Sequence, residues 1–233
     1  MSTIEGTSVR GITIDGRLRV PANIDSLQKF REWVHADDFP EKMHVSYIAG
    51  DVEVQMSPEN AEFHGKPKVQ LVIRLGALIE DRELGDLYTD SMMLVCPETD
   101  LATEPDLVFC SYAAQQAGRV RASEWVAGSG NFVEIVGAPD LVVEVVSRSS
   151  VRKDTRSLRE KYFKAGIPEY WLIDTRGSSI DFQLLVRGET GYDPVAPDSE
   201  GYRLSPVLRT SFLLTRRRNP LGAFTYKLMQ RQA

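Results

Sequence analysis

The chain of 233 residues is 42% hydrophobic and 26% charged, an ordinary composition for a soluble globular protein with a buried core. No apolar segment approaches the roughly 20 residues that span a bilayer, and the N-terminus lacks the apolar stretch of a secretory signal. The net charge of −5 argues against a protein coated in nucleic acid, and two cysteines make neither a disulfide framework nor a zinc cluster. We therefore expect one domain over residues 1–233, cytoplasmic and not membrane-bound.

In the first half of the chain, residue periodicity predicts a helix, a hairpin, a second helix and two strands. Residues 25–37 carry apolar side chains at helical spacing, and residues 44–56 alternate around a Gly-Asp turn, which is a hairpin signal. A long apolar stripe predicts the second helix over about 61–83. Strands are predicted near 86–95 and over 105–111.

In the second half, strands surround one predicted helix. Residues 152–165 have a helical pattern that Gly166 and Pro168 stop. Residues 202–230 alternate short apolar runs with charge and give no firm assignment. The remaining segments are strands at 132–136, 140–146, 169–174 and 179–186, a loop with a short helix at 112–131, and a loop at 188–201. This order predicts a mixed α/β layout with a central sheet, in which 140–174 forms a strand–helix–strand unit.

One charged residue lies inside a densely apolar run. Residues 141–146 read LVVEVV, which predicts a strand covered on both faces with Glu144 in it. A carboxylate there must be paired, protonated or bound to metal, because it has lost its hydration. Spacing alone leaves two interpretations open, a metal-binding or catalytic acid, and a structural salt bridge to Arg148, Arg152 or Lys153.

A second acid stands at a comparable position. Asp106 follows a proline and precedes an apolar run, as Asp140 does at the start of the Glu144 strand. A Pro-Asp pair commonly marks a strand entrance, and this suffices for Asp140. Carboxylates that meet at strand ends beside a lysine would make a hard-oxygen site suited to Mg²⁺, which activates water and neutralises charge on a phosphoryl group. The lysine would orient the water or stabilise the transition state.

Basic residues are concentrated in two places. Residues 148–164 carry seven basic and two acidic side chains, a net charge of +5, and a second basic run covers 216–218. Charge runs are more often solvated faces than binding sites. Because the first run directly follows Glu144, it supplies candidate phosphate contacts, namely Arg148, Arg152 and Arg156.

Three other site classes find no support. His35, His44 and His64 lack zinc-ligand spacing, although His64 remains a secondary candidate because it follows a strand–break–helix junction. The glycines at 128 and 130 lack the lysine and helix of a phosphate loop. No G-x-S-x-G segment supports a serine hydrolase.

Four segments occur together in an order that matches a known family. They are MSP at 56–58 followed by His64, EPDLVF at 104–109, PDLVVEVVS at 139–147, and AGIPEYWLID at 165–174. In these segments the chain resembles the Uma2 family (also called DUF820) of the PD-(D/E)XK nuclease superfamily. The resemblance covers about residues 40–186, with the N-terminal helix and the C-terminal extension outside it.

The resemblance implies a restriction-endonuclease-like core, a mixed α+β fold whose central mixed sheet is flanked by helices. It implies Mg²⁺-dependent hydrolysis of DNA phosphodiesters, with Mn²⁺ as a substitute, and Asp106 and Glu144 as the metal-binding acids. His64 and Asp51 match further positions of the family pattern and are expected to support the same cleft. A homodimer is expected because cutting both strands of a duplex often uses a two-fold dimer.

One family feature is missing. The superfamily lysine stands two residues after the second acid, where this chain has Val146, and many Uma2-like sequences carry it instead at the position of Leu158. Lys153 and Lys161 are the nearest replacements. Lys153 is favoured, because a residue at the helix entrance can lie close to the end of the Glu144 strand.

Two functional hypotheses follow. The first is a metal-dependent DNA endonuclease that uses the acids and a replacement lysine. The alternative is a nuclease-fold protein that has lost efficient catalysis and binds nucleic acid or a protein partner, which the missing lysine and the negative net charge favour.

Overall fold

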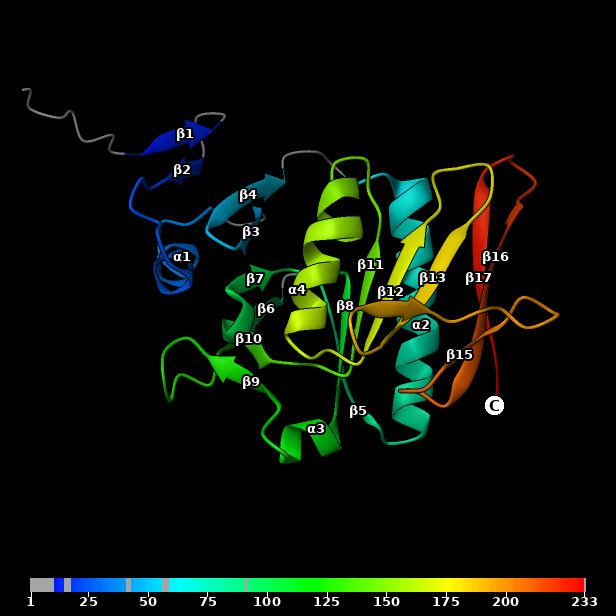
Figure 1. Ribbon diagram of the computed structural model, residues 1–233. Coiled ribbons are helices and arrows are strands. Elements are labelled where there is room, and N and C mark those ends of the chain that lie inside the picture. The colour runs from blue at the N-terminus through cyan, green and yellow to red at the C-terminus, as the bar shows by residue number, and fades with distance from the viewer. Residues whose placement is uncertain (1–10, 15–17, 41–42, 56–58, 91, 233) are drawn as a thin grey trace, which may run out of the picture.

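The computed structural model describes residues 11–14, 18–40, 43–55, 59–90 and 92–232. Figure 1 shows two sheets side by side, with a smaller sheet at the C-terminal side. The MSP segment at 56–58 lies outside the described residues. Among the described helices, none has the length and apolar character needed to cross a membrane.

The central sheet is mixed, as expected. Strands β11 and β12 run parallel, and every other neighbouring pair in this sheet is antiparallel. In spatial order its strands are β14 (Tyr192–Pro194), β13 (Asp181–Arg187), β12 (Glu169–Asp174), β11 (Leu141–Val145), β8 (Leu107–Ser111) and β5 (Gly85–Thr89).

Helices cover both faces of this sheet (Figure 1). On one face, α2 (Lys66–Asp81) buries Leu71 and Leu75 against alternate residues of β11 such as Val143. On the other face, a π-helical turn, η3 (Lys153–Leu158), leads into α4 (Arg159–Lys164), which packs on Val142. The strand is apolar on both sides because both sides are covered.

The second sheet is also mixed and lies beside the first. Its only parallel pair among the described strands is β6 with β10. Its order is β4 (Asp51–Gln55), β3 (His44–Ile48), β7 (Leu101–Thr103), β6 (Met93–Cys96), β10 (Phe132–Gly137) and β9 (Val120–Glu124).

The N-terminal elements pack on the second sheet through an apolar cluster and one buried carboxylate. Helix α1 (Leu27–Val34) follows the small hairpin β1 (Ile12–Ile14) and β2 (Leu18–Val20). The fully buried Glu134 of β10 accepts hydrogen bonds from Arg31, the shorter at 2.5 Å, and lies 3.0 Å from Nε2 of His35. Burial raises the pKa of Glu134, but these two partners outweigh it and hold the pKa at about 2.

The C-terminal extension adds a three-stranded antiparallel sheet of β15 (Arg203–Ser205), β16 (Thr210–Arg218) and β17 (Phe224–Gln232). Its edge strand β17 lies along α2, and Tyr226 and Leu228 join the core on that side of the central sheet. Glu169 of β12 fixes the junction, since its carboxylate accepts hydrogen bonds from Nε1 of Trp171 at 2.6 Å and from the amide of Val207 at 3.2 Å.

The predicted helices and most predicted strands are confirmed, with four corrections. The single strand predicted at 86–95 is wrong, because this segment supplies β5 to the central sheet and β6 to the second. Strand β9 was hidden in the predicted loop 112–131, which also holds the short helix α3 (Tyr112–Gln116). Strand β14 lies in the predicted loop 188–201, and β7 follows a 3₁₀ turn, η2 (Pro97–Thr99), in a segment without a prediction.

Replacing Glu169 by Gln should remove a pH dependence of folding stability. Burial raises the pKa of Glu169 to about 7, so the folded protein holds this proton more tightly than the unfolded chain does. The folded state therefore loses stability as the pH rises from about 4.5 to about 7, by on the order of 2–3 kcal/mol. In urea unfolding between pH 5 and 8, the free energy of unfolding of Glu169→Gln should rise by this amount relative to that of the wild type.

The exposed acid Glu98 provides the control, and Glu98→Gln should follow the wild-type curve throughout. Parallel curves for Glu169→Gln and the wild type would contradict the assignment of a buried, protonated carboxyl group.

Candidate functional site

A polar pocket of about 100 Å³ opens between the β3–β4 hairpin and the adjacent ends of β8 and β11. The two sheets meet here, and the first turns of η1 (Ala61–Gly65) and η3 supply further side chains. Its ionisable lining residues are His44, Glu53, Glu59, His64, Asp90, Glu104, Asp106, Glu144, Lys153 and Asp154. Acids dominate this set, so the pocket carries a negative charge that suits a cation.

Asp106 and Glu144 lie close to each other at one end of the β8–β11 ladder. The last pair of this ladder is Leu107 with Val143, Asp106 directly precedes β8, and Glu144 follows Val143 in β11. Both side chains line the same pocket. The Asp106 carboxylate is fixed in this place because its Oδ2 accepts the Val145 amide at 2.7 Å.

Two cations from one helical segment hold Asp106 in its charged form. The Nε2 of His64 lies 3.4 Å from Oδ2 and the Nζ of Lys68 lies 3.3 Å from Oδ1. Burial raises the pKa of Asp106, but His64 and Lys68 bring it below its ordinary value. Asp106 is therefore a fixed, ionised carboxylate.

His64 is held as an imidazolium. Its Nδ1 lies 3.2 Å from Glu59 Oε2 without the geometry of a hydrogen bond, and its Nε2 faces Asp106. Burial lowers the pKa of His64, but the two carboxylates outweigh burial and raise it to about 10. A protonated ring has no lone pair to offer, so in this state His64 positions Asp106 and does not bind metal.

Glu144 is surrounded quite differently. It is 4% exposed, and its Oε1 accepts a hydrogen bond of 2.8 Å from the hydroxyl of Tyr162 on α4. Burial, followed by repulsion from Asp154, raises its pKa well above the ordinary value, although Lys153 acts in the opposite direction. No ion pair joins Glu144 to a basic side chain among the described residues, so the predicted structural salt bridge to Arg148, Arg152 or Lys153 is absent.

Asp154 is a third buried acid, and its carboxylate is not fully hydrogen-bonded. It is 1% exposed, and its Oδ1 has no hydrogen-bond partner. Burial raises its pKa to about 6, which the neighbouring ammonium of Lys153 only partly offsets. A buried acceptor without a partner costs about 1–3 kcal/mol, so this carboxylate is a place where a cation would add stability.

Lys153 is the cation that reaches the acids without being tied to one. Its side chain lines the pocket and forms no hydrogen bond or ion pair within 4 Å in the described structure. Burial lowers its pKa, but the charges of Glu144, Asp154 and Asp106 together raise it above the ordinary value. The ammonium is therefore charged and available to a ligand in the pocket.

The donor set fits a divalent cation. Asp106 is ionised, while Glu144 and Asp154 are acids whose pKa values are raised mainly by burial, which a bound cation would offset. Carboxylate oxygens are the ligands that Mg²⁺ and Mn²⁺ prefer. Ligand atoms of Glu59, His64 and Asp106 also lie within 4.8 Å of one another and form a second candidate set. Asp106 is common to this set and to the pair with Glu144.

Two predicted site residues lie away from the pocket. Asp51 is exposed at the start of β4 and does not line it, whereas Glu53, two residues later on the same strand, does. The Nζ of Lys161 donates a 2.6 Å hydrogen bond to the Thr99 carbonyl, which ties this lysine to the second sheet. Of the two candidate lysines, the structure therefore brings only Lys153 to the acids.

The three predicted phosphate contacts lie near the pocket but not in it. Arg148, Arg152 and Arg156 are exposed and form no ion pair in the described structure. Ser147 and Ser149, which flank Arg148 in the chain, both line the pocket. The three arginines are therefore accessible to an anionic ligand.

Sequence reasoning missed three site residues, Glu59, Lys68 and Asp154. Lys68 forms ion pairs with Glu59, Asp90 and Asp106, at distances between 2.8 and 3.3 Å. Its spacing of four from His64 was an available signal, because such residues share one face of a helix. Asp154 had no signal of its own, since it lay within a basic run on a helix predicted to be regular.

Comparison with known proteins agrees with this fold. A crystal structure of a "putative nuclease belonging to DUF820" from Anabaena variabilis ATCC 29413 shares the fold, with a TM-score of 0.55 and 17% identity. The match covers 78% of this chain and 90% of that chain. Comparison with curated proteins found no significant match. The Uma2 family model, described as "Putative restriction endonuclease", matches residues 27–216, a longer span than the motifs alone indicated. The chain belongs to the Uma2 family, a family of restriction-endonuclease-like nucleases.

Proposed function

We propose that this protein is a Mg²⁺-dependent endodeoxyribonuclease that hydrolyses phosphodiester bonds in the pocket between the two sheets. The observation that carries the proposal is the pair of buried acids in one pocket, Asp106 and Glu144, with the unpaired ammonium of Lys153 in the same pocket. Mn²⁺ would substitute for Mg²⁺, because both prefer oxygen ligands.

In this proposal Asp106 and Glu144 hold the metal, which supplies Lewis-acid stabilisation of the phosphoryl group and a more acidic bound water. His64 and Lys68 fix the Asp106 carboxylate in one orientation, and Tyr162 orients that of Glu144. The Lys153 ammonium stabilises the negative charge that develops on the phosphate oxygens in the transition state. Lys153 thus takes the role of the missing lysine.

DNA is proposed as the substrate, with Arg148, Arg152 and Arg156 contacting its backbone phosphates at the pocket mouth. A homodimer belongs to the same proposal, because two strands of a duplex need two active pockets related by the two-fold symmetry of the substrate. The cytoplasmic location stays a prediction from the sequence.

A second candidate, a nucleic-acid or protein binding module without efficient catalysis, is favoured by one observation. The two positions where the lysine is expected, Val146 and Leu158, are both part of the hydrophobic core. If Lys153 cannot take over, the acids would retain metal while cleavage would be lost. Salt-dependent DNA binding without metal-stimulated cleavage is the result that this alternative predicts.

Metal binding should raise the thermal stability of the wild type. Saturating Mg²⁺ or Mn²⁺, at about 100 times its dissociation constant, stabilises the folded state by about 2.7 kcal/mol. For a chain of this size the melting temperature should rise by roughly 5–10 °C. Asp106→Asn and Glu144→Gln should each lose most of this rise in differential scanning fluorimetry.

Asp51→Asn is the matched control, because it removes one carboxylate, as the two site variants do, but lies outside the pocket. It should keep the full rise. An unchanged rise in both Asp106→Asn and Glu144→Gln would place the metal elsewhere.

Substitutions of Lys153 and Lys161 should have different effects on the cleavage of plasmid DNA. Lys153→Gln should lower kcat by about 10²–10³-fold, the usual effect of removing one group that stabilises transition-state charge. Lys161→Gln should change kcat by no more than about threefold, because its ammonium is bound to Thr99 and not to the site. Glu144→Ala should abolish cleavage.

Circular dichroism of each variant controls for folding. Undiminished cleavage by Glu144→Ala would refute its role as ligand, and a larger loss in Lys161→Gln than in Lys153→Gln would reverse the lysine assignment.

A further inference from the structure

A second hollow, of about 500 Å³, lies away from the active pocket, between α2 and the β16–β17 hairpin. Four of its lining residues are cations, Arg74, Arg216, Arg217 and Lys227, and none is acidic. We call it the basic groove. It includes part of the 216–218 basic run, which neither the core nor the active pocket uses.

The charge of the basic groove is not cancelled. The side chains of Arg74, Arg217 and Lys227 form no ion pair or hydrogen bond among the described residues. Arg216 donates to the carbonyls of Thr175 and Gly177, both at 2.6 Å, and these neutral acceptors leave its charge in place. In a chain of net charge −5, such a concentration of unpaired cations marks a site of anion attraction.

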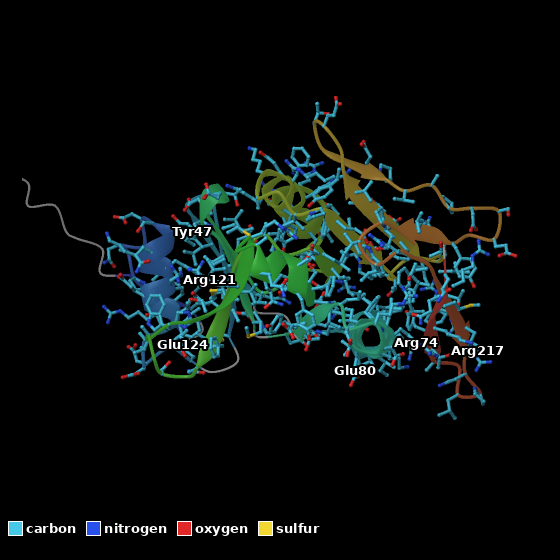
Figure 2. All side chains as sticks on the ribbon, turned by 90° about the horizontal axis from the view of Figure 1, so that it is seen from below. Tyr47, Arg74, Glu80, Arg121, Glu124 and Arg217 are labelled. Atoms are coloured by element: carbon cyan, nitrogen blue, oxygen red, sulfur yellow. The ribbon has the colours of Figure 1, made fainter. Side chains whose placement is uncertain are left out.

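The cations of the basic groove come from segments far apart in the sequence, which distinguishes the groove from a run of charged residues along one exposed segment. Arg74 comes from α2, whereas Arg217 and Lys227 come from the hairpin about 140 residues later in the chain. The ladder pairs Arg217 with Thr225 and Thr215 with Lys227, so the two cations share one face of the hairpin at a diagonal spacing of about 7–8 Å. In Figure 2, Arg74 lies on the side of α2 toward Arg217, and Glu80 lies away from it.

The basic groove is also joined to the active end of the molecule. Arg216 binds the Thr175 carbonyl, and the Thr175 hydroxyl donates a 2.6 Å hydrogen bond to the carbonyl of Phe63, the neighbour of His64. Figure 1 shows the start of α2, the end of β12 and the turn of the β16–β17 hairpin along the same edge of the fold. A long anion bound at the active pocket can therefore continue toward the groove.

We propose that the basic groove binds the phosphate backbone of duplex DNA outside the scissile phosphate, as a second contact that anchors the substrate. The inference rests on the proposed nuclease function and adds to it. Unpaired arginines and lysines without an acidic neighbour suit backbone phosphates, which carry charge but no sequence information. Two of the four cations, Arg217 and Lys227, lie beyond residue 216, where the family match ends, so the groove is built partly from this chain's own extension.

The test removes the charge of the groove without touching the active pocket. In a Glu144→Gln background that prevents cleavage, the triple variant Arg74→Gln/Arg217→Gln/Lys227→Gln is titrated with a fluorescent duplex of about 30 base pairs, roughly 100 Å long. We expect at least a tenfold loss of affinity at low salt. The slope of log K against log salt should become shallower by about 0.9 for each phosphate that the protein no longer neutralises.

Two matched variants accompany it. Lys29→Gln/Arg121→Gln/Lys164→Gln removes the same formal charge at sites outside the groove, and it should keep affinity and salt slope close to the parent values. Arg74→Lys/Arg217→Lys keeps the charge of the groove and should retain affinity within about threefold. A backbone phosphate needs a positive charge here and not the paired N–H donors of a guanidinium group. Thermal unfolding by circular dichroism checks that each variant folds.

An unchanged affinity and salt slope in the groove triple would overturn the proposal, as would an equal loss in the control triple. Loss of binding to phosphatidylserine vesicles, with duplex binding retained, would overturn it in favour of a membrane-facing surface. Plasmid cleavage by the wild type separates this inference from the proposed function. Groove-dependent binding without cleavage would support the groove and refute the nuclease, whereas cleavage with groove-independent binding would do the reverse.

Discussion

The burial of carboxylates at one end of the central sheet determines how the surrounding elements are arranged. Asp106, Glu144 and Asp154 have exposures of 8%, 4% and 1%, and each must be compensated because a buried charge without a partner is costly. Asp106 is compensated by His64 and Lys68 from the helical segment on one side. Glu144 accepts a hydrogen bond from Tyr162 on the other side, Asp154 lies next to Lys153 in η3, and both acids remain incompletely compensated. The site thus has one satisfied acid and two that a cation would complete.

Lys68 and Lys153 have different roles because they differ in how closely they pair with the buried carboxylates. Lys68 makes three ion pairs, and the attraction of Asp106 and Asp90 keeps its pKa above the ordinary value despite burial. It cannot leave Asp106 without uncovering a buried charge, so it is a positioning residue. Lys153 has neighbouring negative charge but no bound partner, which leaves its ammonium free to meet a phosphate. One lysine preserves the geometry, and the other is available for chemistry.

Much of this fold could be predicted from the sequence, because the central strands and helices carry strong local signals. The apolar run around Glu144 predicts a strand covered on both faces. The Pro-Asp pair before Leu107 predicts the start of another strand, and this strand pairs with the Glu144 strand. The division of 86–95 between two sheets could not be predicted, since no proline or glycine marks the break and only tertiary pairing decides the partners of each half. Lys68 was missed because its partners Asp90 and Asp106 are distant in the chain, and Asp154 because it lies within a basic run. The π-helical turns that bring His64 and Lys153 to the acids have no recognised sequence signal.

The packing of the β16–β17 hairpin against the start of α2 has a consequence for folding. The Lys66 ammonium donates to the Phe224 carbonyl at 2.9 Å, and Phe63 packs on the ring of Phe224, across about 160 residues of chain. Interactions of such long range form slowly, because the chain must first close a long loop at a cost in entropy. The segment that carries His64 and Lys68 is therefore fixed by contacts that close a loop of about 160 residues. The central sheet can form before this loop closes, so the orientation of His64 and Lys68 toward Asp106 belongs to a late step of folding.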